Sequence, residues 1–201
     1  QKHIHSVDMK GNITTIDKTK GHHGAAFSSN YSYSIHNHSD ANTPPIYTLR
    51  NSKGNVLRNI VENDDLASKL DSYEYSEKTF FTFENHTEEE LNCWMILPHD
   101  FDEAKEYPVY VAIYGGPGVN TVLDSWGGTT FMWHQYLAQE GYIVASVDPR
   151  GTPNRGRKFE HSTYKKLGKL ETADFIDFAK YLGSQSYIDK ERIGIQGWSY
   201  G

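Results

Sequence analysis

The pattern of apolar residues changes near residue 63, and this change limits what the chain can fold into. Residues 3–62 read as short strands separated by turns, with no sustained helical period. Beyond them, strand-length apolar runs alternate with helical patterns; the strands are expected at 79–84, 91–97, 109–114 and 142–147, and the helices at 131–140 and 172–182. Strands that alternate with helices indicate a mostly parallel sheet. We therefore expect two domains, an all-β one at 1–63 and an α/β one at 64–201.

The first half carries clear turn signals. Two hairpins are predicted, one over 3–17 about Lys10-Gly11-Asn12 and one over 46–61 about the turn at 51–55. Within 31–36 the Tyr and Ile residues share one face and the Ser and His residues the other, which predicts a half-buried strand. These strands suit one blade of a β-propeller or part of a β-sandwich.

Two helices have specific sequence signals. Asn63 is expected to cap a helix over 64–70. Four residues of the helix at 172–182 share one face at helical spacing and are predicted to lie in the core: Phe175, Ile176, Ala179 and Leu182.

Charge and hydropathy exclude several classes of partner. The net charge is −6, and no run of Lys or Arg is longer than a pair, so we expect no binding to nucleic acid or to an anionic membrane. No apolar stretch approaches the roughly 18 residues of a membrane span. The single cysteine, Cys93, lies in an apolar run and is predicted to be buried.

The motif Gly197-Trp198-Ser199-Tyr200-Gly201 follows a short predicted strand at 192–195. Gly-x-Ser-x-Gly alone is a weak signal, but after a strand it is typical of the sharp turn that exposes a catalytic serine. A dinucleotide-binding loop would need a Gly-x-Gly spacing that is missing here. The pattern predicts Ser199 as a nucleophile, which requires a base and donors for the oxyanion.

No histidine follows Ser199, although α/β-hydrolases place the triad Asp or Glu and then His after the serine. We therefore expect the base and its carboxylate beyond residue 201 and expect the chain by itself to be inactive. His22-His23 and His36-x-His38 are interpreted as loop and strand-face residues. No carboxylate or cysteine completes a ligand set at either place, so the sequence predicts no metal site and no cofactor.

A predicted strand at 109–114 leads into Gly115-Gly116-Pro117-Gly118, where hydrolase folds place a loop of the oxyanion hole. Together with Asp148-Pro149-Arg150-Gly151, Leu167-Gly168-Lys169 and the serine motif, this loop resembles, in order and spacing, the dipeptidyl peptidase IV branch of the prolyl oligopeptidase family of serine peptidases. The resemblance covers the whole chain. It implies the N-terminal part of an α/β-hydrolase domain, preceded by the last strands of a β-propeller.

The resemblance also implies roles for residues. Ser199 would be the nucleophile, and the Tyr114 hydroxyl and the Tyr200 backbone N–H would bind the oxyanion. Tyr114, Trp198 and Tyr200 would contact substrate. Members of the family release N-terminal dipeptides, with Pro or Ala in second position, from peptides with a free N-terminus.

Other interpretations stay open at this point. A related peptidase that releases tripeptides shares the serine motif, a general esterase is a more distant alternative, and a non-catalytic binding or structural module belongs to another class. With one cysteine, we expect a bacterial enzyme exported to the periplasm or the cell surface. The number of propeller blades and the oligomeric state, a homodimer included, stay open.

Overall fold

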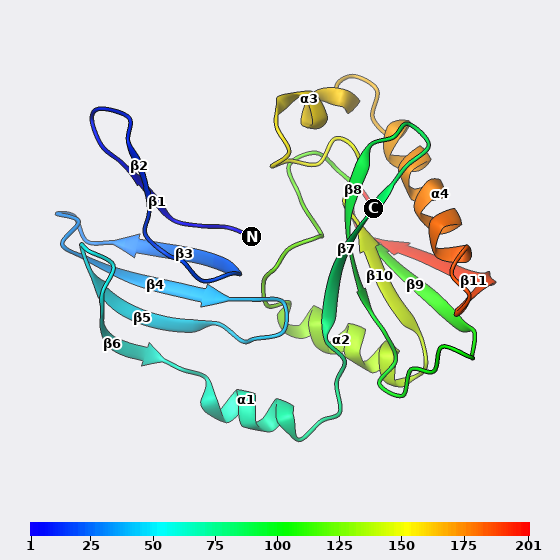
Figure 1. Cartoon of the computed structure of the whole chain (residues 1–201), viewed down its shortest axis with the longest axis horizontal. Coiled ribbons are helices and arrows are strands. Elements are labelled where there is room, and N and C mark those ends of the chain that lie inside the picture. The colour runs from blue at the N-terminus through cyan, green and yellow to red at the C-terminus, as the bar shows by residue number, and fades with distance from the viewer. The chain divides into compact units, whose positions relative to one another are not determined.

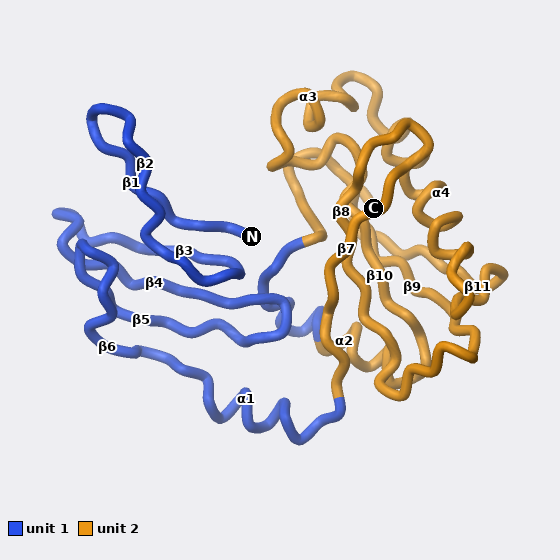
Figure 2. Tube along the Cα trace, viewed as in Figure 1, with its two compact units in different colours: residues 1–74, 123–131 blue, residues 75–122, 132–201 orange.

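The computed structural model describes residues 1–201, which form two compact units (Figure 2). The first contains residues 1–74 and 123–131, and the second contains 75–122 and 132–201. None of the helices is both long and apolar enough to span a bilayer.

The first unit consists of small antiparallel sheets followed by a helix (Figure 1). β1 (His5–Val7) pairs with β2 (Ile13–Thr15), and four strands pair in chain order: β3 (His22–Phe27), β4 (Tyr33–Ser39), β5 (Ile46–Asn51) and β6 (Val56–Val61). A four-stranded antiparallel meander is the unit from which propeller blades are built. The predicted all-β segment with its two hairpins is confirmed.

Two details of this sheet differ from the sequence-based expectation. His22 and His23 do not lie in a loop but begin β3, a strand that the sequence pattern did not predict. In β4 the polar face is the covered one, because His36 stacks on the His23 ring of the neighbouring strand at a centroid distance of 5.2 Å. Tyr33 and Ile35 on the other face are about half exposed, at 52% and 48%.

The helix α1 (Asp64–Asp71) forms where it was predicted, but not through the expected cap. Asn63 adopts a left-handed conformation with φ 59°, and its side chain makes no hydrogen bond to the helix. Its amide instead donates to the Pro45 carbonyl, which holds the start of α1 against the start of β5.

The second unit contains a five-stranded mixed sheet in the order β11-β9-β10-β8-β7. Its strands are β7 (Lys78–Glu84), β8 (Glu90–Ile96), β9 (Tyr107–Ile113), β10 (Ile143–Val147) and β11 (Ile188–Gly197). β9 runs parallel to both of its neighbours, whereas the β10–β8 and β8–β7 pairs are antiparallel. A mostly parallel sheet was therefore only half right, because the short turn at 85–89 folds β7 and β8 into a hairpin.

Helices cover both faces of this sheet, because alternate residues of its strands point to opposite sides. Trp94 and Val144 pack with Leu137 of α2 (Gly128–Gln139) on one face. Cys93 and Ile143 pack with residues of α4 (Leu170–Gly183) on the other. Two short elements, α3 (Arg157–Glu160) and η1 (His161–Thr163), precede α4.

The buried stripe of α4 is shifted from the predicted one. Phe178 and Leu182 are 1% and 0% exposed, whereas Ile176 is 50% exposed. The buried positions Asp174, Phe178 and Leu182 repeat every four residues, so a buried carboxylate occupies a place that apolar periodicity would not assign to the core.

The Asp174 carboxylate joins three segments of the second unit. It is fully buried and accepts hydrogen bonds from the Arg150 guanidinium (Nη2 at 2.7 Å), from the Arg150 backbone N–H at 2.8 Å and from the Asn85 side-chain amide at 2.7 Å. Since a buried ion pair is stable only when its hydrogen bonds are complete, this carboxylate fixes the β7–β8 turn and the loop after β10 onto α4.

We predict that Asp174→Asn lowers the free energy of unfolding by about 3–5 kcal/mol, because it leaves the Arg150 charge buried without its partner. The matched control is Asp189→Asn, which breaks an Asp–Arg pair whose Arg192 side chain is 58% exposed and should cost less than about 1 kcal/mol. Urea denaturation of both variants checks this. Equal losses of unfolding free energy in the two variants would show that the buried Asp174–Arg150 pair stabilises the fold no more than an exposed pair does.

His134 of α2 is a second buried ionisable group. Its ring lies 5.2 Å from the Trp94 ring, and its side chain is 6% exposed. Burial, assisted by the charge of Lys78, lowers the pKa of His134 to about 4. A histidine that is neutral in the folded state and protonated in the unfolded state destabilises the fold as the pH falls.

We predict that acid sensitivity decreases in His134→Gln. The pKa of His134 falls from 6.5 to about 4 on folding. The contribution of the neutral imidazole to the free energy of unfolding is therefore complete above pH 6.5 and is lost as the pH drops toward 4. That loss reaches about 2 kcal/mol at pH 5. Unfolding free energies at pH 7.5 and 5 should therefore differ less in the variant, and the exposed His161→Gln serves as control. An unchanged pH dependence in His134→Gln would contradict the prediction.

Candidate active site

The parallel pairing of β9 places the predicted catalytic segments at one edge of the sheet. Ile113, the last residue of β9, pairs with Gly197, the last residue of β11. Parallel strands end on the same side of a sheet. Tyr114 and Trp198, the residues that follow β9 and β11, therefore begin at neighbouring positions. β10 also runs parallel to β9 and ends beside them, before Asp148.

The turn after β11 is sharp and strained. Ser199 has φ 60°, a left-handed conformation that costs a residue with a side chain about 1–2 kcal/mol. A Cβ atom on Gly197 would lie 2.2 Å from the Gly201 carbonyl carbon, and one on Gly201 would lie 2.6 Å from the Ile113 carbonyl oxygen. Neither position accepts a side chain, which explains the glycines two residues before and after the serine.

Tyr114 and Tyr200 approach each other across this edge. Their ring centroids are 6.1 Å apart at an interplanar angle of 40°. Gly116 lies against both: a Cβ atom there would be 2.8 Å from Tyr114 Cε1 and 2.8 Å from Tyr200 Cγ. The glycine-rich loop after β9 thus packs directly on the serine turn.

Three groups of this edge have no internal hydrogen-bond partner: the Ser199 hydroxyl, the Tyr114 hydroxyl and the Tyr200 backbone N–H. The chain's own hydrogen bonds leave the two donors available to an external acceptor. They also leave Ser199 without a base, because no histidine or carboxylate contacts its hydroxyl.

Glu171 is a residue of this edge that the sequence analysis missed. The Tyr200 hydroxyl donates to its carboxylate Oε1 at 2.9 Å, and Glu171 is 2% exposed. Burial and this hydrogen bond to a carboxylate raise the pKa of the Tyr200 phenol. The signal was its place two residues after the Leu167-Gly168-Lys169 motif, but a glutamate in the first turn of a helix is common for other reasons.

Asp148 fixes the segment that follows the glycine-rich loop. Its buried carboxylate accepts hydrogen bonds from the Thr121 backbone N–H and from the Asn120 side-chain amide, both at 2.7 Å. Burial raises the pKa of Asp148, and these hydrogen bonds oppose the rise. Asp148 therefore ties the loop after β9 to the end of β10.

An apolar hollow of about 470 Å³ adjoins Tyr114 and Tyr200. Its walls come from β9, β11 and α4 and include Ile113, Phe175 and Ile195. Glu171 also lines it and is the one carboxylate among the lining residues; its Oε2 atom is buried without a partner.

The structure does not gather every predicted site residue. Ser199, Tyr114 and Tyr200 lie at one edge, whereas the Trp198 ring is 84% exposed and makes no ring contact or hydrogen bond with either tyrosine. Its role in substrate binding stays a prediction, as do the roles of the other three.

Comparisons with known proteins agree with this geometry. Residues 129–201 match the profile of the prolyl oligopeptidase family. The whole chain is 36% identical to dipeptidyl peptidase 4 of Trichophyton equinum and 33% identical to a probable dipeptidyl peptidase 4 of Emericella nidulans. In both cases it spans 26% of the relative, about a quarter of its length.

Solved structures show the same relationship. The chain superposes on the crystal structure of Porphyromonas gingivalis dipeptidyl peptidase 4 with a TM-score of 0.94 and 40% identity, over 98% of this chain and 28% of that one. A putative dipeptidyl aminopeptidase IV from Bacteroides ovatus matches with a TM-score of 0.85 and 31% identity, also over 98% and 28%. Over its whole length the chain is thus similar in sequence and structure to a segment of dipeptidyl peptidase 4 proteins, and its residues 129–201 match the prolyl oligopeptidase family.

Proposed function

We propose that the protein containing this chain is a serine exopeptidase that releases N-terminal dipeptides through an acyl-enzyme on Ser199. The observation that carries the proposal is the strained serine turn, which presents Ser199 beside two uncommitted hydrogen-bond donors. A backbone strain of this kind persists only where the surrounding structure enforces it, and it is concentrated at functional sites.

The chemistry assigns a task to each group. The Ser199 oxygen attacks the peptide carbonyl carbon, and its proton passes to a general base and then to the leaving amine. The negative charge that develops on the carbonyl oxygen is bound by the Tyr114 O–H and the Tyr200 N–H. Water then attacks the resulting ester, releases the dipeptide and restores the Ser199 hydroxyl. The general base is a residue other than those that contact Ser199 in this structure.

The proposed release of dipeptides follows the relatives named dipeptidyl peptidase 4, and the preference for Pro or Ala in second position follows the motif resemblance described above. Tyr200 supports it, because its ring is held by Glu171 and by Gly116 and can form one wall of a small apolar pocket. The carboxylate contact fixes the ring orientation and leaves the backbone N–H of the same residue free for the oxyanion.

We predict that the full-length protein cleaves Gly-Pro and Ala-Ala p-nitroanilides and spares N-acetyl-Gly-Pro p-nitroanilide, because an exopeptidase recognises the free amine. Ser199→Ala should lower kcat on the order of 10⁶-fold, since the covalent route is lost. Initial rates on the substrate panel measure both effects.

Other outcomes of the same panel would replace the proposal. Faster release from Ala-Ala-Pro than from Gly-Pro would identify a tripeptide-releasing peptidase, and turnover of esters alone would identify an esterase. Hydrolysis that survives Ser199→Ala, or no hydrolysis at all, would refute the assignment of Ser199 and favour a non-catalytic module.

We predict that Tyr114→Phe lowers kcat about 10²–10³-fold with little change in KM, because the phenol acts on charge that exists only in the transition state. Tyr110→Phe is the matched control, because it removes a hydroxyl from β9, the strand that leads into Tyr114. The Tyr110 hydroxyl donates to Gln196 at 2.9 Å. It should stay within about threefold of the parent protein, as expected for a single exposed hydrogen bond. Equal effects in the two variants would remove Tyr114 from the oxyanion site.

A further inference from the structure

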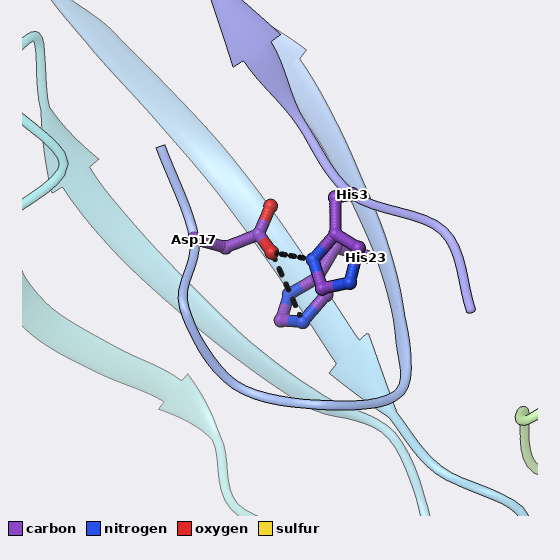
Figure 3. Close-up of side chains that lie close together, drawn as sticks. All are labelled: His3, Asp17 and His23. Carbon is purple, nitrogen blue, oxygen red and sulfur yellow. Dashed lines mark hydrogen bonds and ion pairs between the residues drawn. The ribbon is translucent and has the colours of Figure 1, made fainter. Parts of the chain in front are cut away.

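Three side chains that are distant in the sequence meet in the first unit. His3 precedes β1, Asp17 follows β2 and His23 lies in β3, and Figure 3 shows both imidazoles directed at the Asp17 carboxylate. His3 Nδ1, Asp17 Oδ1 and His23 Nε2 each contribute one atom to a group that lies within 4.8 Å. From this convergence we propose that His3, Asp17 and His23 bind a divalent transition-metal ion, with Zn²⁺ as the best fit.

His3 Nδ1 contacts Asp17 Oδ1 directly and would have to move away from it to admit an ion, whereas the distance from His23 Nε2 to the same oxygen already suits a small tetrahedral ion. His23 Nε2 lies 3.4 Å from Asp17 Oδ1, which is beyond the usual range of an N–H···O hydrogen bond. Ligands at about 2.0–2.1 Å from Zn²⁺ are separated by about 3.3 Å when they occupy the corners of a tetrahedron. His23 Nε2 donates a hydrogen bond to the Thr19 carbonyl oxygen at 2.9 Å; an ion would replace this proton, and the same oxygen could then serve as a fourth donor.

The Asp17 carboxylate is already oriented to bind an ion. Asp17 is 3% exposed, and its second oxygen, Oδ2, accepts a hydrogen bond from the Ile4 backbone N–H at 2.6 Å. Oδ1 is left facing the two imidazoles (Figure 3). Metal-binding carboxylates are commonly held in this way by a hydrogen bond to the oxygen that does not face the ion.

Two further imidazoles surround the cluster. His36 stacks on His23 at 5.2 Å and is 2% exposed, yet neither of its ring nitrogens has a hydrogen-bond partner. His38 also stacks on His23, at 4.4 Å. Neither His36 nor His38 belongs to the ligand group, so these imidazoles pack beside the proposed site without binding the ion.

The donor set selects the kind of ion. Imidazole nitrogens together with a carboxylate and a carbonyl suit Zn²⁺, Cu²⁺ or Ni²⁺, whereas Ca²⁺ and Mg²⁺ require oxygen ligands. The ion would join the segment before β1, the loop after β2 and the strand β3. Its role would be structural, and it does not depend on the reaction proposed for Ser199.

The test uses the full-length protein without a histidine tag, treated with chelator and then titrated with ZnCl₂ in a calorimeter. We expect one Zn²⁺ per chain, a rise in Tm on binding and no binding of Mg²⁺. His3→Ala and Asp17→Asn should each weaken Zn²⁺ binding at least tenfold, because each removes one ligand. The His3 side chain is 28% exposed, so His3→Ala keeps the test valid even where Asp17→Asn fails to fold.

His22→Ala is the matched control, because His22 precedes His23 in β3 and belongs to no ligand group. It should leave Zn²⁺ affinity unchanged. Absence of Zn²⁺ binding, or equal weakening by His22→Ala and His3→Ala, would overturn the proposal and identify the cluster as a hydrogen-bond network alone.

Discussion

The parallel pairing of β9 with β10 and β11 is the constraint from which the candidate site follows. A parallel ladder makes its strands end on one side of the sheet, and here that side receives Tyr114, Asp148 and the serine turn. None of these residues needs a long loop to reach the others. The backbone pairing of Ile113 with Gly197 alone places the glycine-rich loop beside Ser199, without any contact between side chains.

Three buried carboxylates then hold the segments around the candidate site in place. Asp148 holds the segment after the glycine-rich loop, Asp174 holds the loop after β10 onto α4, and Glu171 holds the ring of Tyr200. Each is nearly inaccessible to solvent and each binds a segment from elsewhere in the chain. Ionised groups are costly to bury, so Asp148 and Asp174 hold their loops only where hydrogen-bond donors reach both carboxylate oxygens, whereas Glu171 keeps its Oε2 atom unpaired.

The sequence predicted those parts of the molecule that depend on local patterns. The strand before Ser199, the glycines that the turn requires and the hairpins of the first unit all carry short-range signals, and the structure confirms them. The apolar periodicity of α4 was also informative, but it missed Asp174 because a buried charge is made acceptable by Arg150 and Asn85, which lie far away in the sequence.

The failures share a cause. The antiparallel pairing of β10 with β8 makes the sheet mixed, and Asn63 bonds to Pro45 instead of capping α1, because in both places distant partners outweigh local preference. The convergence of His23 with Asp17 could not be predicted from spacing either, since the order of ligands along a chain does not reveal which loops a sheet brings together. For the same reason His22 and His23 of β3 were interpreted as loop residues, and His36 and His38 of β4 as residues of a strand face.

The left-handed backbone of Ser199 has a consequence for how this position changes over evolutionary time. Glycine adopts that conformation without strain, so a lineage in which cleavage is no longer selected would gain stability by replacing this serine with glycine. Alanine would bring no such gain, because it keeps the Cβ atom. Position 199 is therefore a marker of selection: a serine retained there records a continuing need for its hydroxyl, and a glycine would mark a descendant that keeps the fold for another purpose.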